Sequence, residues 1–254
     1  MMSDQNFINL TKQVGIVLEK RKLKNVRCQV VVLVDVSGSM TSLFGDGTVQ
    51  TVSDRMFAIA WVFDDNQTLE CWAFDDKAYE LPSITEANYA DYVKKNIIHN
   101  KDIEWGGTNY TPALKAAFEH FFETTALGEA VQAVKSGWAK LNPFAKKAAV
   151  APVIAPVAAG EPQDPVFVLF LTDGSNGDVN ATEEFISNIG DHNIYIQSIG
   201  IGHNTFTTLK NLRDKHENVG FFDVKDIAKI NNDELYSQII DEKFVAWYNK
   251  RTVA

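Results

Sequence analysis

The sequence predicts an α/β fold: a doubly wound, mostly parallel sheet with helices on both faces and one short antiparallel edge strand. Short runs of β-branched and aromatic residues alternate with amphipathic helical patterns along most of the chain, as they do in repeated βαβ units. Two runs, "VVVLVD" from Val30 and "VFVLFLTD" from Val166, are almost wholly apolar and end in an acid. Such runs are typical of strands that are buried on both faces of a parallel sheet.

The composition bounds the class of protein and its partners. The chain has 254 residues, of which 45% are hydrophobic and 22% charged, enough for a sizeable domain of ordinary globular composition. Its net charge of -9 argues against a nucleic-acid partner, because a phosphate backbone would repel it. The two cysteines, Cys28 and Cys71, are too few for a disulfide framework, so we interpret them as buried thiols in a reducing cell.

The sequence carries no pattern for export or for a membrane span. The first stretch, "MMSDQNFINLTKQVGIVLEKRK", is polar and lacks the apolar core of a signal peptide. No apolar run approaches the ~20 residues that a membrane-spanning helix needs. We therefore predict a cytoplasmic protein.

The first third of the chain predicts two helices and three strands. Apolar residues at helical spacing over Asn6–Leu23 indicate a helix, and Val30–Val34 is the first strand. Ser53 is the expected cap of a helix that runs to about Phe63. Thr68–Phe74 is the next strand, with "AYELP" as a short antiparallel neighbour.

The middle of the chain predicts two helices around a loop. Glu86–Lys95 has a helical pattern, and the pair Gly106 and Gly107 requires a loop. Thr111 and Pro112 then supply a hydroxyl cap and a first-turn proline, which is a typical start of a helix.

The last third repeats the alternation of strand and helix. After the strand that starts near Val166, Thr182 is the expected cap of a helix to about Ile189. "IYIQSIGIG" predicts a strand, "FTTLKNLRDK" a helix and "VGFFDV" a short strand. Asn232 or Asp233 would cap one last amphipathic helix that runs to about Tyr248.

The chain divides into an N-terminal helix, a domain and an insertion. We expect residues 1–25 to pack on a domain of residues 26–250. Residues 126–165 interrupt it, first mildly basic, then rich in Ala, Val and Pro without periodicity, as in flexible chain. Two interpretations of this insertion stay open: a flexible solubilised loop, or a segment that docks on a partner or a membrane surface.

Five oxygen-bearing side chains are expected to gather beyond the carboxyl ends of the central strands. These are Asp35, Ser37, Ser39, Thr108 and Asp173. Open parallel sheets bind ligands at that edge, near the point where the strand order reverses. The set contains only hard oxygen donors, which suit Mg²⁺, Mn²⁺ or Ca²⁺ but not Zn²⁺. We predict a Mg²⁺ site with a coordination position left for water or for an oxygen of a ligand.

The same residues resemble a known motif. Asp35, Ser37 and Ser39 form D-x-S-x-S, Thr108 follows Gly-Gly, and Asp173 lies in T-D-G. This order is similar to the metal-ion-dependent adhesion site of von Willebrand factor A domains, which have a Rossmann-like fold. The resemblance implies that Ser37, Ser39 and Thr108 contact the metal, that Asp35 and Asp173 act partly through water, and that a partner's acidic side chain completes the coordination.

Further stretches resemble one branch of this family. "WGGTNYTP", "PVFVLFLTDG", "GFFDVKDI" and "DELYSQII" are similar to the bacterial tellurium-resistance (Ter) proteins of the TerF-like group. The resemblance covers about Val14 to Trp247 and departs from the family over 126–165. It implies a cytoplasmic, stress-associated protein whose partners are other tellurium-resistance proteins.

Four other acids and an enzymatic function are alternatives to this prediction. We interpret Asp46 and Asp178 as turn residues, and for Asp75 and Asp76 we favour a solvated turn over a place at the metal rim. A phosphoryl-transfer hydrolase on the same fold would need a second carboxylate two residues after the first, where this chain has Ser37. There is no P-loop and no G-x-S-x-G motif. We therefore predict a binding module without catalytic residues.

Overall fold

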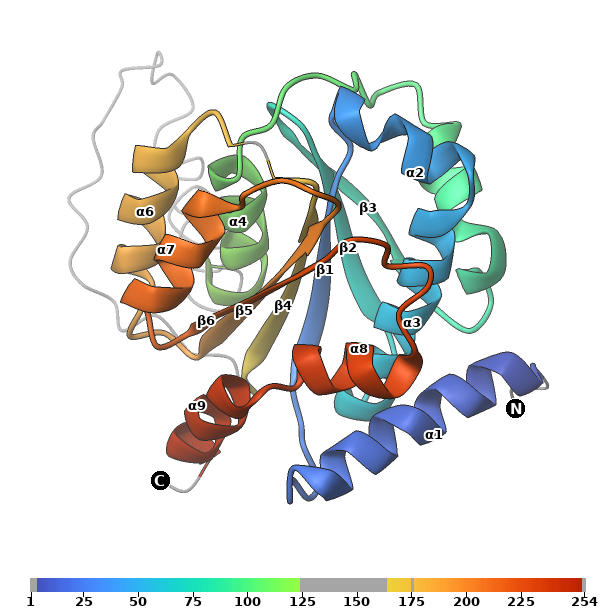
Figure 1. Ribbon diagram of the computed structural model, residues 1–254, viewed down its shortest axis with the longest axis vertical. Helices are drawn as coiled ribbons and strands as arrows, with labels where there is room; N and C mark the ends of the chain where they lie inside the picture. The colour runs from blue at the N-terminus through green and yellow to red at the C-terminus, as the bar shows by residue number, and fades with distance from the viewer. Residues whose placement is uncertain (1–3, 124–163, 175, 253–254) are drawn as a thin grey trace, which may run out of the picture.

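A six-stranded sheet forms the centre of the computed structural model, which describes residues 4–123, 164–174 and 176–252. The strand order is β3-β2-β1-β4-β5-β6, and only β3 is antiparallel to its neighbour. The strands are β1 Gln29–Asp35, β2 Leu69–Phe74, β3 Ala78–Ile84, β4 Val166–Thr172, β5 Ile194–Ile201 and β6 Val219–Val224. The predicted fold class is confirmed, including the antiparallel edge strand (Figure 1).

Helices cover both faces of this sheet. One face carries α1 Gln5–Lys20, α2 Thr41–Gly45, α3 Thr48–Phe63, α8 Asn232–Ile239 and α9 Glu242–Thr252. The other face carries α4 Thr111–Phe118, α6 Val179–Asn188 and α7 Thr207–Lys215. Strand β1 serves both layers, since Val30, Val32 and Val34 lie in the first core and Val31 and Leu33 in the second.

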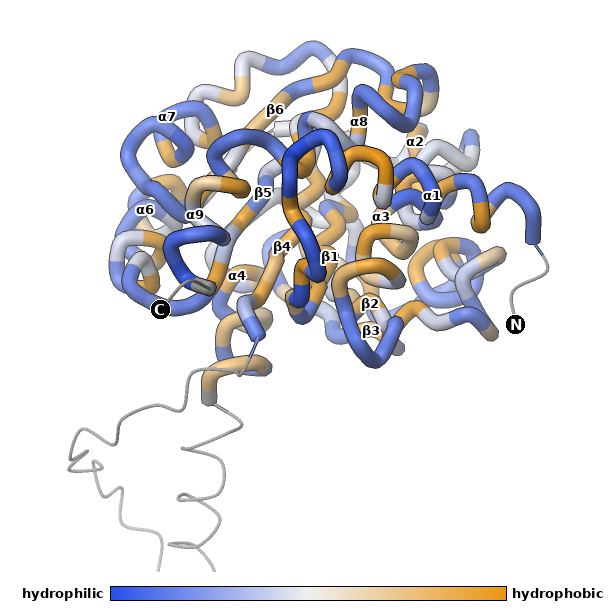
Figure 2. Tube along the Cα trace, turned by 90° about the horizontal axis from the view of Figure 1, so that it is seen from below, coloured by the Kyte–Doolittle hydropathy of each residue, from blue (hydrophilic) through white to orange (hydrophobic). Residues whose placement is uncertain are grey.

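The hydropathy of the chain follows these layers. In Figure 2 the tube is mostly orange along β1 and β4, whereas α7 and α9 show much blue. Helix α1 also presents an apolar side to the domain: the ring of Phe7 lies 5.0 Å from that of Phe57 on α3, measured between centroids. The N-terminal helix is therefore part of the first core.

Helix α3 begins earlier than the sequence predicted. It starts at Thr48, after Gly47 with a φ of 83° and Asp46, whose Oδ1 accepts a hydrogen bond of 2.9 Å from the Thr48 amide. Ser53 is buried inside this helix and is not its cap. The start of α3 is thus made by a left-handed glycine and an acid, which precede the apolar pattern.

Other helix boundaries also differ from the prediction, and Thr111 is the first residue of α4 instead of its cap. Thr182 is buried within α6, which begins at Val179, and its hydroxyl donates to the backbone and side chain of Asp178. The last predicted helix is two helices, because the Oδ1 of Asp241 accepts a 2.7 Å hydrogen bond from the Phe244 amide and starts α9 anew. The cap of α8 is Asn231, one residue before the predicted pair.

The region predicted as a helix from Glu86 to about Lys95 is helical from Tyr89 to Ile98. A 3₁₀ turn over Tyr89–Asp91 continues through Tyr92 and Val93 into a π-helical turn over Lys94–Ile98. The insertion at 126–165 lies outside the described residues except for its last two positions. Across the described ranges, no helix is both long and apolar enough to span a membrane.

Candidate metal site

The buried carboxylate of Asp35 is the base of the candidate site. Asp35 lies at the end of β1, between β2 and β4. Figure 1 shows this end of β1 at the upper edge of the sheet. The Oδ1 of Asp35 accepts a hydrogen bond of 2.8 Å from the Ser37 amide, and its Oδ2 accepts one of 2.6 Å from the Thr172 hydroxyl at the end of β4. The side chain is fully buried, so two neighbouring strand ends fix its orientation.

Two serine hydroxyls stand directly after this carboxylate. The Oγ atoms of Ser37 and Ser39 lie 3.1 Å apart. Ser37 is buried, whereas Ser39 is exposed. A 3₁₀ turn over Gly38–Met40 brings the two side chains together, although one residue is buried and the other is exposed.

Thr108 reaches the same edge from the loop before α4. Its side chain is buried, and its backbone carbonyl accepts a 2.7 Å hydrogen bond from the amide of Gly177. Two residues before it, the carbonyl of Gly106 accepts a 3.3 Å hydrogen bond from the amide of Gly38. The loop of Thr108 is therefore bonded directly to the turn that carries the two serines.

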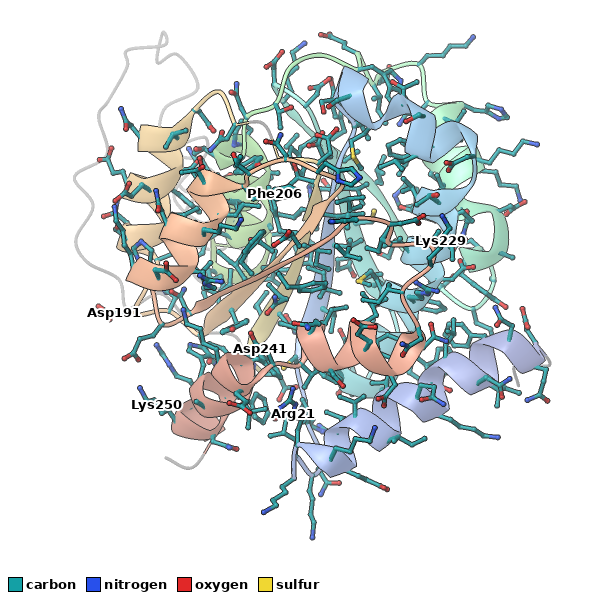
Figure 3. All side chains as sticks on the ribbon, in the orientation of Figure 1. Arg21, Asp191, Phe206, Lys229, Asp241 and Lys250 are labelled. Carbon is teal, nitrogen blue, oxygen red and sulfur yellow. The ribbon has the colours of Figure 1, made fainter. Side chains whose placement is uncertain are left out.

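Asp173 follows β4 and is half-buried. Its backbone carbonyl accepts a 3.3 Å hydrogen bond from the side-chain amide of Asn204. The next residue, Gly174, has a φ of 110°, and a Cβ there would lie 2.6 Å from the ring of Phe206. Figure 3 labels Phe206 near the upper end of the sheet. A left-handed glycine under an aromatic ring thus fixes the turn that carries Asp173.

The negative charge of Asp173 acts on the buried carboxylate of Asp35. Burial raises the pKa of Asp35 to about 6, the hydrogen bonds from Ser37 and Thr172 oppose this rise, and the negative charge of Asp173 adds to it. Burial also raises the pKa of Tyr110, and both carboxylates contribute to that rise. A bound cation would relieve a buried carboxylate whose charge is disfavoured by burial and by a second acid.

The donor set fits a hard divalent cation. Both Asp35 oxygens already accept a hydrogen bond, which suits a carboxylate that holds a metal through water, while the adjacent serine hydroxyls remain as direct donors. Within the described ranges, no three His, Cys, Asp or Glu side chains gather at metal-ligating spacing. A cation at this edge would therefore depend on hydroxyl oxygens, as the sequence pattern predicts.

The interpretation of Asp75 as part of a solvated turn is wrong. This residue is 1% exposed. Its Oδ1 accepts a 3.0 Å hydrogen bond from the Lys77 amide, and its Oδ2 accepts one of 3.0 Å from the amide of Gly106. The neighbouring Asp76 is exposed, and its Oδ2 accepts a 3.0 Å hydrogen bond from the amide of Gly107. Both acids bind the loop of Thr108, which is 31 residues away along the chain.

Asp178 is a turn residue, as expected, but it also caps a distant helix. Its two carboxylate oxygens accept hydrogen bonds of 2.9 and 3.0 Å from the amides of Tyr110 and Thr111, at the start of α4. This caps the helix directly behind Thr108. The sequence carries no local signal for the contacts of Asp75 and Asp178, because the amides that they bind lie 31 and 68 residues away along the chain.

The comparisons with known proteins agree with this fold. The vWA-TerF-like family model, described as the vWA found in the TerF C terminus, matches residues 27–254. An uncharacterised protein of Bacillus subtilis (strain 168), YcbR, is 29% identical over 241 residues, which cover 93% of this chain and 84% of that protein.

Two solved structures show the same architecture. A von Willebrand factor type A protein from Catenulispora acidiphila matches with a TM-score of 0.51 and 15% identity over 86% of this chain and 43% of that one. Proximal thread matrix protein 1 from the mussel byssus matches with a TM-score of 0.51 and 15% identity over 87% and 48%. The chain thus spans less than half the length of these two solved chains, and at this identity the likeness shows the fold alone.

Proposed function

Because the chain belongs to the vWA-TerF-like family, we propose that it is a metal-dependent protein-interaction module. In this proposal Ser37, Ser39 and Thr108 hold a Mg²⁺ ion, and Asp35 and Asp173 support it partly through water. Mn²⁺ or Ca²⁺ would also suit the oxygen donors. The module has no catalytic residues of its own.

The observation that carries this proposal is the buried carboxylate of Asp35. It has two neutral hydrogen-bond donors, Ser37 and Thr172, and a second acid nearby. A buried carboxylate without a cationic partner is unfavourable for folding. A divalent cation bound by the serine hydroxyls would supply the missing positive charge. Metal binding would therefore explain why a carboxylate is buried at this position.

The chemistry of the donors suggests an acidic partner. A cation held mainly by neutral hydroxyls keeps much of its charge, so it would attract a carboxylate into its open position. The chain has a net charge of -9 and would otherwise repel an acidic protein. Binding would therefore depend on the metal, which makes the interaction conditional.

The cellular setting of the proposal is a bacterial response to tellurite or other chemical stress. The match to the TerF-like family supports this setting, and the partners we propose are other tellurium-resistance proteins in the cytoplasm.

Asp35 is poorly arranged for the hydrolase alternative. A nucleophilic carboxylate needs an accessible oxygen and a nearby acid-base group. The Asp35 side chain is fully buried with both oxygens engaged, and the residue two positions on is Ser37. These features support a binding role.

Thermal unfolding with and without divalent metal tests the proposal. A metal that binds only the native state stabilises it by about 2.7 kcal/mol at a hundred times its dissociation constant. We expect Mg²⁺ or Mn²⁺ to raise the Tm of the wild type more than that of Asp35→Ala or Ser39→Ala. Ser42→Ala, an exposed serine on α2, is the matched control and should respond as the wild type does.

Binding to candidate partners is the second part of the test. If a tellurium-resistance protein binds the wild type in Mg²⁺, this binding should be lost when a chelator is added. It should also be lost when Ser39→Ala replaces the wild type. Partner binding that persists without metal would contradict the proposal, as would equal metal responses in the wild type and Ser39→Ala.

A further inference from the structure

The turn between β2 and β3 lies against the loop that carries Thr108. In Figure 1 this loop crosses the upper ends of the strands. Four hydrogen-bonding groups join the two segments: the carboxylates of Asp75 and Asp76 and the amides of Gly106 and Gly107. We call this set the β2–β3 clasp.

Asp75 is the buried half of the clasp and brackets Thr108. Its Oδ2 bonds the amide of Gly106, two residues before Thr108, and its backbone carbonyl accepts a 2.9 Å hydrogen bond from the amide of Asn109, one residue after it. The hydroxyl of Tyr79 on β3 lies 3.1 Å from each carboxylate oxygen. The Asp75 carboxylate is thus fully engaged by neutral donors and has no role left as a direct metal ligand.

Asp76 is the exposed half and explains the paired glycines. A Cβ at Gly106 would lie 2.8 Å from one Asp76 carboxylate oxygen, and a Cβ at Gly107 would lie 2.7 Å from the other. Neither glycine has the positive φ that would by itself require glycine. The absence of side chains at both positions therefore serves the close approach of the Asp76 carboxylate to the loop.

The clasp continues into the serine turn. The amide of Gly106 donates to Oδ2 of Asp75, and the carbonyl of Gly106 accepts a hydrogen bond from the amide of Gly38, which lies between Ser37 and Ser39. Two consecutive hydrogen bonds, one to the Asp75 carboxylate and one between backbone groups, thus connect the β2–β3 turn through the Thr108 loop to the turn after β1. Movement of the clasp would change the spacing between the Thr108 hydroxyl and the two serine hydroxyls.

We propose that Asp75 and Asp76 are positioning residues of the metal site, which set its affinity by holding Thr108 against the serine turn. This inference rests on the metal-dependent function proposed above. Neither acid acts as a ligand; each acts through the amides of Gly106 and Gly107. Loss of such an outer partner typically weakens a metal site about tenfold or more, although every ligand remains.

The test uses four forms of the full chain. Asp76→Ala removes the acceptor for the Gly107 amide at an exposed position, so the protein should still fold. Asp76→Asn removes the charge but keeps an oxygen that can accept this hydrogen bond. Glu104→Gln removes a charge from the same region, where Glu104 pairs with Lys77 at 2.6 Å, and leaves the clasp intact.

Two readouts separate positioning from charge. Calorimetric titration with Mn²⁺ should show binding about tenfold weaker in Asp76→Ala and within about twofold of the wild type in Asp76→Asn and Glu104→Gln. Equal weakening in all three variants would mean that charge alone matters and would overturn the proposal. Wild-type affinity in Asp76→Ala would overturn it too.

Amide hydrogen exchange in metal-free protein gives the second readout. The amides of Gly107 and Thr108 should exchange faster in Asp76→Ala, but not in Asp76→Asn or Glu104→Gln, while core strand amides stay protected. If the wild type binds no metal but the Gly107 amide responds in this way, the proposed function fails and the clasp stands as a loop restraint. If exchange at Gly107 is unchanged in Asp76→Ala, the clasp does not hold the loop and the inference fails.

Discussion

Replacing Asp35 by asparagine should stabilise the metal-free protein while it removes the response to metal. Burial raises the pKa of Asp35 from 3.8 to about 6. A difference of about two pKa units corresponds to about 3 kcal/mol. Because the folded state binds this proton more tightly than the unfolded state, stability falls as the pH rises from 3.8 to 6, and the whole penalty is present at pH 7.

Asparagine fits the same space without the charge. Its carbonyl can accept from the Ser37 amide, and its NH₂ group can donate to the Thr172 hydroxyl, which is free to turn. The bond to Ser37 becomes weaker without the charge, so we expect a net gain of about 1–3 kcal/mol at pH 7. For a domain of this size that is a rise in Tm of roughly 2–10 °C.

Thermal and denaturant unfolding in chelator at pH 7 and pH 4 measure this effect. The gain of Asp35→Asn over the wild type should shrink at pH 4, where Asp35 itself is largely protonated. Asp65→Asn, at a side chain that is 62% exposed, should change stability little at either pH. A metal-free Asp35→Asn that is less stable than the wild type at pH 7, or a gain that does not depend on pH, would refute the reasoning.

Three further predictions concern other parts of the molecule. Asp178→Ala should destabilise the protein by about 1–2 kcal/mol in urea unfolding, because the start of α4 loses its cap; an unchanged midpoint would contradict this. Cys28 and Cys71 should react with a thiol reagent only on unfolding, since burial raises both thiol pKa values, that of Cys71 to about 12; fast labelling of the native protein would be the opposite result. Asp54→Asn should stabilise the protein by about 1 kcal/mol at pH 7 and not at pH 4, because burial raises the pKa of this partly exposed acid to about 6; equal effects at both pH values would exclude this cause.

The sequence predicted the strands well because their signal is local. The apolar run of β1 and its acid are contiguous, and the run cannot form a long helix before Asp35 interrupts it. The residues expected at the metal site follow from the same logic, since strand ends of a parallel sheet share one edge. The alternation of strands and helices then leaves few topologies to consider.

Helix boundaries were predicted less well because several residue types near one another can start a helix. The hydroxyls of Ser53 and Thr182 looked like caps, yet Gly47 and Asp178 precede them and start the two helices. At the C-terminus, Asp241 begins a new helix inside an amphipathic pattern that continues across it. A periodic pattern alone does not report such a break.

The contacts that organise the site could not be predicted from spacing. Asp75 and the amide of Gly106 are 31 residues apart, and Asp178 caps a helix start 68 residues before it. Each acid has the sequence pattern of an ordinary turn residue. Its partner is a backbone amide, which almost every residue has, so the sequence does not mark it. Only the fold shows that both acids hold the loop of Thr108.

Calorimetric titration of Mn²⁺ into the metal-free protein at pH 7 tests the central claim most directly. We expect the wild type to bind the ion, Ser39→Ala to bind it about tenfold more weakly or worse, and Ser42→Ala to match the wild type. Such a result would assign the metal to the edge of the sheet that carries Asp35, Ser39 and Thr108. Absence of binding in the wild type, or equal binding in Ser39→Ala, would contradict a metal site at this edge.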